Sequence, residues 1–464
     1  MSDDLKYKAS RWCNLFKKND VLAVFHSLTL ELFFLDVSFE DILRQLTNIS
    51  MKEDDLKKRL GGKIFNLLKE NSFIITEETD DLRMLFVLRE ELKERIKPSI
   101  LYLLLTDGCN LKCRYCFEEV PEIIGKFTPK MMSLDDTKKA LNYFTKLVMK
   151  YGSENRQTII HLYGGEPMMN PSAVKVAVLH SQNLKQRGLL PNDCEIAIVT
   201  NGTLINEKFA KFFAENNVTV GLSIDGPKHV NNAYRIAKDG KTDVSEKINF
   251  CYKLLRKYGV KVGFSVTMSP SVVENFDEVL DFFVNDIGIP DGICFNILHY
   301  NPLVKTNVGY FKETAESLIK AFKLFRGKNI YEERMMRKAK SFAFKEPIFS
   351  DCGVNGGQIV IAPDGKVGIC HDFIKPRKYF GDNLLSNPDY DPFKAGLYDG
   401  WKSRSPFFME QCYDCEAIAI CGGGCPASIE LHTGNRWNVD ERMCPHSKLT
   451  LEWLIWDTYK NTIT

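Results

Sequence analysis

Short apolar runs alternate with longer amphipathic stretches between residues 99 and 298. The short runs are typical of buried strands, and the longer stretches have the period of helices. The predicted strands cover residues 100–105, 159–163, 196–200, 218–224, 262–267 and 293–298, and the predicted helices cover 134–151, 172–187, 206–216, 245–258 and 274–286. Right-handed crossovers curl such a parallel sheet towards a barrel. The pattern therefore predicts an α/β fold, a partial (β/α)6 TIM barrel with helices outside.

Residues 1–98 follow a different pattern. A hairpin is predicted over 21–25 and 30–35, helices over 39–46, 54–70 and 82–96, and a strand over 73–76. These elements predict a small α+β unit of winged-helix character. Winged helices often bind DNA, but the charges after Lys52 are of both signs and give no clean basic face. Docking of a peptide along a strand edge or a helix groove fits this unit better.

The remaining chain divides into a connection and a cysteine-rich tail. Residues 301–345 are rich in helical pattern, and their basic run from Arg334 to Lys340 is expected to be a solvated helix face. Residues 346–464 are rich in Gly, Pro and Cys and show little periodicity before a helix predicted over 449–459. Their apolar core would be small, so we expect metal clusters to hold them together. The predicted domains are thus 1–98, 99–300, 301–345 and 346–464.

Composition and charge exclude several classes of protein. The chain has 464 residues, of which 44% are hydrophobic and 26% charged, so it can bury large cores. A net charge of +2 is too small to indicate nucleic acid or a membrane surface as the main partner. The first residues lack the apolar core of a signal peptide, and no apolar run is long enough to span a bilayer. We therefore expect a cytoplasmic protein.

Fourteen cysteines in a reducing compartment are expected to be metal ligands more often than disulfides. Four of them are isolated and are expected to be small buried hydrophobes: Cys13, Cys194, Cys251 and Cys294. Cys109, Cys113 and Cys116 share one loop directly after the first barrel strand. Three such thiolates can hold three irons of a four-iron cluster and leave the fourth iron open to a small molecule. A zinc knuckle is the alternative, but zinc normally takes four ligands and no fourth one is near.

Other motifs also follow barrel strands. Gly164, Gly165 and Glu166 come after the second strand, 200–203 after the third, and 223–227 after the fourth. Active sites of parallel barrels form at the carboxy ends of the strands, so these motifs should converge on one mouth. The tail adds seven cysteines: Cys352, Cys370, Cys412, Cys415, Cys421, Cys425 and Cys444.

At these residues the chain resembles the radical S-adenosylmethionine (SAM) enzymes, and within them the SPASM-containing peptide and protein maturases, over about residues 99 to 464. The resemblance implies that Cys109, Cys113 and Cys116 are catalytic and bind a [4Fe-4S] cluster whose open iron chelates SAM. It implies that Gly164, Gly165 and Glu166 take the SAM ammonium. Tyr115 would pack near the adenine, or else simply anchor the loop.

Ser223 and Arg235 match the pair that in relatives contacts the SAM carboxylate. An arginine suits this role because its planar fork can bond both oxygens. Asp225, between them in the sequence, is expected only to cap its turn.

The seven tail cysteines have the spacing of the SPASM pattern. By resemblance, Cys412, Cys415, Cys421 and Cys444 would hold auxiliary cluster two, and Cys352, Cys370 and Cys425 auxiliary cluster one. The chain would then carry three [4Fe-4S] clusters and SAM. Cluster one would be a ligand short, because there is no cysteine between residues 295 and 351. We expect its open iron to bind the thiolate of a substrate cysteine.

The resemblance implies an enzyme that matures a ribosomally made, cysteine-containing precursor peptide by a thioether crosslink. The 1–98 unit, similar to peptide-recognition (RRE or PqqD-like) domains, would bind the leader, and an external donor of flavodoxin or ferredoxin type would supply electrons. Carbon–carbon crosslinking, another oxidation and anaerobic sulfatase maturation are the alternatives within the enzymes. An iron–sulfur electron carrier is the alternative outside them. No nucleic acid or membrane partner is expected. His299 and His371 are left without a role.

Overall fold

The computed structural model describes residues 5–117, 128–152, 157–288, 290–302 and 304–463, and residues 1–4 of the predicted amino-terminal unit lie outside this part. Its largest sheet has nine strands in the order β12-β11-β10-β9-β8-β7-β13-β14-β15. The six barrel strands are β7 (Ile100–Thr106), β8 (Ile159–Gly164), β9 (Glu195–Thr200), β10 (Thr219–Ser223), β11 (Val262–Met268) and β12 (Gly292–Ile297). Each pairs in parallel with the next along the chain. The predicted six-stranded partial barrel is therefore confirmed, each strand to within two residues.

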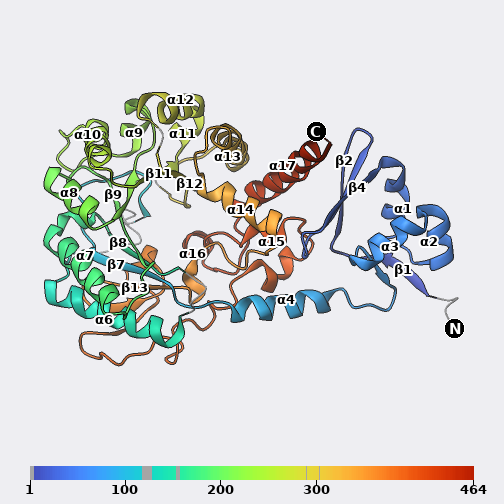
Figure 1. The fold of residues 1–464 in the computed structure, drawn as a ribbon, viewed down its shortest axis with the longest axis horizontal. Helices are drawn as coiled ribbons and strands as arrows, with labels where there is room; N and C mark the ends of the chain where they lie inside the picture. The colour runs from blue at the N-terminus through green and yellow to red at the C-terminus, as the bar shows by residue number, and fades with distance from the viewer. Residues whose placement is uncertain (1–4, 118–127, 153–156, 289, 303, 464) are drawn as a thin grey trace.

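The barrel helices lie outside the sheet (Figure 1). They are α6 (Leu134–Tyr151), α7 (Pro171–Gln186), α8 (Glu207–Glu215), α9 (Lys228–Tyr234), α10 (Val244–Lys257), α11 (Pro270–Glu274) and α12 (Phe276–Asp281). The single helix predicted over 274–286 is wrong, because Asn275 leaves the helical region between α11 and α12 and residues Phe282–Asp286 form a π-helical turn. Aliphatic residues of strands and helices share one core with almost no exposed surface.

The tail joins the barrel through its sheet, which the sequence pattern did not predict. Strand β13 (Gln358–Ile361) pairs in parallel with β7, with Gln358 opposite Ile100. Strands β14 (Lys366–Gly368) and β15 (Phe380–Asn383) then continue antiparallel. Their short length hides them from periodicity. The consequence is that the cysteines around β13 and β14 lie next to the first barrel strand, whose carboxy end carries the Cys109 loop.

Over its described residues 5–98, the amino-terminal unit has two small sheets and four α-helices. The sheets are β5-β1-β6 and β2-β3-β4, made of β1 (Lys6–Ala9), β2 (Cys13–Lys18), β3 (Val21–His26), β4 (Leu32–Asp36), β5 (Met51–Lys52) and β6 (Ile74–Thr76). The helices are α1 (Glu40–Gln45), α2 (Glu53–Leu60), α3 (Gly62–Glu70) and α4 (Leu82–Glu94). The hairpin is confirmed, but the single helix predicted over 54–70 is wrong. Gly61, with φ of 78°, breaks it into α2 and α3.

This unit lies beside the tail and apart from the barrel (Figure 1). It has its own core between the sheets and helices α1 to α3. A second apolar cluster joins its β2-β3-β4 sheet and α4 to tail helices. Phe25 stacks on Phe342 at a centroid distance of 6.0 Å, and Phe34 contacts Tyr459 at 4.9 Å. The unit is thus packed onto the tail.

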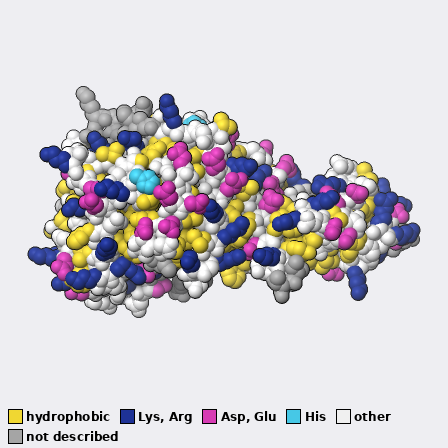
Figure 2. All heavy atoms as spheres, turned by 90° about the horizontal axis from the view of Figure 1, so that it is seen from above, with side chains coloured by type: hydrophobic (Ala, Val, Ile, Leu, Met, Phe, Trp, Pro, Cys, Tyr) yellow, Lys and Arg dark blue, Asp and Glu magenta, His cyan; other side chains and the backbone are white. Residues whose placement is uncertain are grey.

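The helices that follow the barrel are α13 (Tyr310–Arg326), α14 (Glu333–Phe344), α15 (Ile418–Cys421), α16 (Pro426–Thr433) and α17 (Met443–Ile463). The solvated helix face predicted for the basic run is wrong. Lys338, on α14, is only 2% exposed, because α14 packs between β12 and the tail. The face seen in Figure 2 mixes basic and acidic side chains, as the small net charge predicts. Within the described residues, no helix combines the length and apolarity that crossing a membrane requires.

Candidate cluster and cofactor site

The three-cysteine loop after β7 is fixed by backbone hydrogen bonds to the segment that follows α9. The Lys112 N–H donates to the Ile236 carbonyl at 2.8 Å, and the Arg114 N–H donates to the Tyr234 carbonyl at 2.9 Å. Within the loop, the Leu111 N–H points at the Cys109 Sγ at 3.4 Å. A backbone donor of this kind favours a thiolate, which is the form that binds iron.

Gly164 and Gly165 at the end of β8 lie against the start of this loop. A Cβ on Gly164, whose φ is 143°, would lie 2.0 Å from the Thr106 carbonyl oxygen. A Cβ on Gly165 would lie 2.3 Å from the Gly108 carbonyl oxygen. The Gly165 N–H donates to the Thr106 carbonyl at 3.1 Å. The glycines are thus required by the cysteine loop itself, whatever else binds there.

Glu166 is 1% exposed and bonds to the next strand's loop. Its Oε1 accepts from the Thr200 hydroxyl at 2.7 Å and from the Met168 N–H at 2.9 Å, and its Oε2 accepts from the Asn201 N–H at 2.7 Å. Burial raises the pKa of Glu166 to about 7. The carboxylate therefore ties the second and third barrel loops together, a role that the sequence did not indicate.

Arg235 is held by a carboxylate of the protein. Its Nε and Nη2 donate to the two oxygens of Asp225 at 2.9 and 3.0 Å, and both side chains are buried. The Tyr115 hydroxyl donates to the same carboxylate at 2.6 Å, and its ring lies 5.4 Å from the guanidinium carbon. The expectation that Asp225 only caps a turn is wrong. Ser223 is the last residue of β10 and precedes Asp225 by two positions in the sequence.

Aromatic and imidazole rings line the barrel interior between the first loop and the tail. Tyr102 on β7 lies 5.0 Å from His161 on β8 and 4.6 Å from His371 in the tail. His371 also contacts Tyr163 at 4.8 Å and Phe117, from the cysteine loop, at 6.3 Å. The sequence signal that could have revealed this lining is the presence of aromatic or polar residues at inward-facing positions of the strands. These rings connect the two cysteine regions.

The structure separates the seven tail cysteines into two groups. Cys412, Cys415, Cys421 and Cys444 form one, called here the four-thiol group, and they act on one another electrostatically. Burial, and then the neighbouring thiols, raise the pKa of Cys412 and of Cys444 to about 12. The Gly423 N–H points at the Cys421 Sγ at 3.4 Å. A metal must displace the protons of these thiols on binding.

Cys352, Cys370 and Cys425 form the three-thiol group, and these also act on one another. Each of their sulfurs accepts a backbone N–H from a residue two or three positions later: Val354, Asp372 and Ser428 respectively. Cys370 is buried and Cys425 is partly buried, whereas Cys352 is exposed. The division into four and three is the one that the SPASM resemblance implies.

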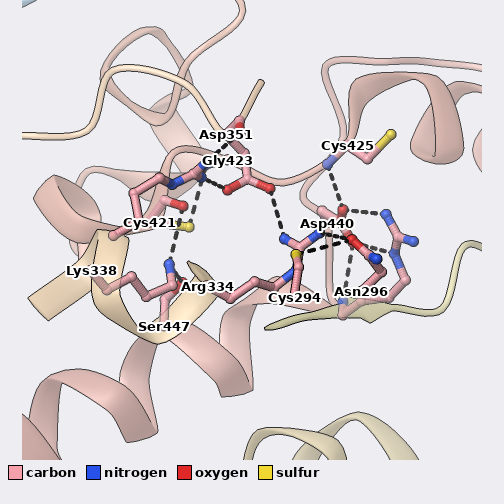
Figure 3. Close-up of polar contacts among 12 residues, drawn as sticks. Cys294, Asn296, Arg334, Lys338, Asp351, Cys421, Gly423, Cys425, Asp440 and Ser447 are labelled. Carbon is pink, nitrogen blue, oxygen red and sulfur yellow. Dashed lines mark hydrogen bonds and ion pairs between the residues drawn. The ribbon is translucent and has the colours of Figure 1, made fainter. Parts of the chain in front are cut away.

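Basic side chains of α14 reach this region from one side (Figure 3). The Lys338 Nζ donates to the Ile420 carbonyl at 2.8 Å and to the Ser447 hydroxyl at 3.1 Å, and it lies near Cys421. Arg334 forms an ion pair with Asp351, the residue before Cys352, at 3.6 Å. Sequence reasoning missed these residues, although their four-residue spacing places them on one helix face.

Comparison with known proteins places the chain in a family. Residues 103–283 match the model of the radical SAM superfamily. A serine-type anaerobic sulfatase-maturating enzyme of Bacteroides thetaiotaomicron is 34% identical over 68% of this chain and 80% of its own length. This chain belongs to the radical SAM superfamily. Enzymes of this family work with a [4Fe-4S] cluster and SAM.

Two further proteins match this radical SAM enzyme over nearly its whole length. The radical SAM cyclopropyl synthase TigE of Paramaledivibacter caminithermalis is 25% identical over 96% of this chain and 95% of its own. Structures of Streptococcus suis SuiB bound to SAM and to its precursor peptide SuiA cover 94% of this chain and 99% of SuiB, at TM-scores of 0.56 and 0.53 and identities of 16% and 17%. The SuiB structures share with this chain the fold of a barrel with a SPASM domain.

The residues present fit the family's cofactors. Three thiols lie on one loop with a backbone N–H aimed at Cys109, as a cluster that leaves one iron open requires. The loop after β8 packs against the start of this loop through Gly164 and Gly165, and the loop after β10 contacts it through the hydrogen bond from Tyr115 to Asp225. The buried Arg235–Asp225 pair supplies a fixed charge next to Tyr115.

Proposed function

We propose that this radical SAM enzyme matures a precursor peptide by joining a cysteine sulfur to a carbon atom in a thioether crosslink. Two relatives support a peptide or protein substrate by their names: a sulfatase-maturating enzyme, and SuiB bound to the precursor peptide SuiA. The observation that carries the proposal is the division of the tail thiols into a complete group of four and an incomplete group of three.

The proposed ligands follow this division. Cys109, Cys113 and Cys116 would hold the SAM-binding cluster, and the four-thiol group would hold auxiliary cluster two. The three-thiol group would hold auxiliary cluster one, beside the aromatic lining of the barrel. When bound, the first cluster and SAM supply a 5′-deoxyadenosyl radical that abstracts a hydrogen atom from the substrate.

The chain's own residues would bind and enclose the reactants. Gly164, Gly165 and Ser223 would offer groups to the amino-acid part of SAM, with Glu166 holding the loops in place. Arg235 would act on the SAM carboxylate through the guanidinium nitrogen that Asp225 does not bond. Tyr102, Tyr163 and the adjoining rings would exclude water from the radical.

The reaction balances as a two-electron oxidation of the peptide. One C–H bond and one S–H bond break, and one C–S bond forms. The 5′-deoxyadenosyl radical takes one hydrogen atom, the thiol gives up its proton, and the remaining electron passes to an auxiliary cluster. We further propose that residues 1–98 bind the leader of the peptide, which raises the effective concentration of the core segment at the site. An external one-electron donor starts each cycle.

A carbon–carbon bond is the second candidate product. The likeness to TigE extends over almost the full length of both chains and favours ring closure or crosslinking between carbons. Both candidates use the same hydrogen abstraction. They differ in the fate of the substrate thiol, which only the thioether reaction consumes.

One experiment separates them. The reconstituted enzyme, SAM, a reductant and a short cysteine-containing precursor peptide would be incubated without oxygen and analysed by mass spectrometry. We expect a mass loss of about two hydrogens, one fewer thiol available to alkylation, and production of 5′-deoxyadenosine. Cys113→Ala should lower 5′-deoxyadenosine formation by at least about 1000-fold, while iron falls from about twelve to about eight per chain. The same mass loss with every thiol still alkylated would favour the carbon–carbon product.

A further inference from the structure

The three-thiol group has an oxygen donor beside it. Asp372 follows Cys370 by two residues and is only 4% exposed. Its Oδ2 lies 3.9 Å from the Cys425 Sγ. Its charge also acts on Cys352 and Cys370. The carboxylate is therefore directed into the space that the three sulfurs share.

Two imidazoles lie next to this carboxylate, one near each of its oxygens. The His299 Nδ1, just after β12, lies 3.5 Å from the Asp372 Oδ2, and the His371 Nε2 lies 3.4 Å from the Oδ1. Ligand atoms of His299, Asp372 and Cys425 all lie within 4.8 Å of one another, which is a grouping able to hold a metal. His371 is in turn packed at tilted angles among barrel rings, so the position of Asp372 is set by the barrel as well as the tail.

The charges of these groups favour binding of a metal by the carboxylate. Three thiols and a buried carboxylate, all negative when ionised, lie together beside the barrel, with Cys352 on the solvent side. Such a gathering is unfavourable unless a multivalent cationic centre binds the ligands. A four-iron cluster has one more iron than this group has sulfurs.

We propose that Asp372 is the fourth protein ligand of the cluster held by Cys352, Cys370 and Cys425, and that His299 positions it. This inference rests on the proposed function and changes its detail, because the fourth iron is then capped by oxygen in the resting enzyme. Carboxylate is a harder and weaker ligand for iron in a sulfur cluster than thiolate is. A substrate thiolate can therefore replace it, exchanging one iron–oxygen bond for one iron–sulfur bond without moving an electron. The thiol proton goes to solvent.

The test uses the full-length chain with Cys109, Cys113 and Cys116 replaced by alanine, reconstituted with iron-57, so that only the auxiliary clusters contribute to the Mössbauer spectrum. We expect a distinct component from about one in eight irons, with the higher isomer shift of an oxygen-bound site. Asp372→Cys should remove this component while keeping the iron content. Asp372→Ala should leave that iron open to carbon-13 cyanide, seen as a new carbon coupling by electron–nuclear double resonance. Asp414→Asn is the matched control, because this aspartate also adjoins a tail cysteine but its side chain is 82% exposed.

Identical Mössbauer spectra in the parent and Asp372→Cys would overturn the proposal, even if Asp372→Ala failed to fold. So would a single bound metal ion, with iron near four per chain, since His299, Asp372 and Cys425 would then form a mononuclear site. Failure of this inference is distinct from failure of the proposed function. The thioether product could still form with unchanged spectra, and an oxygen-bound iron could exist in an enzyme that forms no thioether.

Discussion

The four-thiol and three-thiol groups lie in the same tail but have different surroundings. Lys338 and Arg404, both buried, lie near sulfurs of the four-thiol group. The three-thiol group shares its space with Asp372 and adjoins the barrel rings, and it has a buried cation, Arg442, near its Cys425. Buried cations stabilise an anionic cluster that is saturated with thiolates, whereas a carboxylate next to a reaction chamber suits an iron that changes partners. Under the proposed function, the first group would store electrons and the second would contact the substrate.

The test with the largest expected effect replaces one cysteine of each group. Cys352→Ala should lower crosslinked product by at least about 100-fold while SAM is still cleaved, because the first cluster and the fold remain. Cys412→Ala should instead lower the melting temperature by several degrees or more, since metal binding helps to hold the tail together. Product and 5′-deoxyadenosine would be measured by mass spectrometry and unfolding by circular dichroism. Equal loss of stability in both variants would contradict the difference in roles.

A second test sharpens the electrostatic contrast. Lys338→Met removes a buried cation and leaves the Ile420 carbonyl without that donor, which should cost about 1–3 kcal/mol of stability. It should also lower the midpoint potential of the four-thiol cluster by on the order of 50 mV, because the reduced cluster loses a compensating charge. Potentiometric titration followed by electron paramagnetic resonance measures this shift. Lys340→Met, exposed on the same helix, is the control and should change neither quantity.

The last prediction concerns the helix that supports the four-thiol group. Glu332 caps α14, accepting from the Met335 N–H at 2.7 Å, and burial raises its pKa from 4.5 to about 7. Between these values the folded chain holds a proton that the unfolded chain has lost. Stability should therefore fall as pH rises from about 4.5 to about 7, by up to about 3 kcal/mol, and then level off.

Urea unfolding across this pH range checks the prediction. Glu332→Gln should lower the slope of the pH dependence, because the cap keeps an acceptor but no longer titrates, while Glu166, whose pKa burial also raises to about 7, keeps its own contribution. Glu333→Gln, at the exposed neighbouring position, should leave the slope as it is. If the pH dependence of stability is the same in Glu332→Gln as in the parent, another group causes it.

The sequence predicted the barrel well and the tail poorly, for a physical reason. A buried parallel strand such as β7 is a nearly continuous run of apolar residues, which can be recognised in the sequence. Strands β13 to β15 have three or four residues each, too few to show a period. Gly61 is one residue in a strongly amphipathic stretch, and its break appeared only in the structure.

The candidate site shows the same division. Cysteine spacing and the Gly164–Glu166 motif predicted the kind of chemistry, because ligands on one loop must be close in the sequence. The neighbours that act across elements were missed or misread: Lys338 was expected to be solvated, Asp225 to be only a turn cap, and His299 and His371 had no role. The partners of these side chains come from other segments of the chain. Lys338 and Ser447, for example, are 109 residues apart in the sequence.

The sequence by itself determined which side chains are candidate metal ligands and in what order they occur, since periodicity and spacing are local properties. Only the tertiary structure decided which charges meet those ligands. Pairing of β13 with β7 brings the tail to the barrel, and packing of α14 against the tail buries Lys338 beside one thiol group while Asp372 lies beside the other. Burial and electrostatics act through space, so they are set by packing and not by neighbours along the chain.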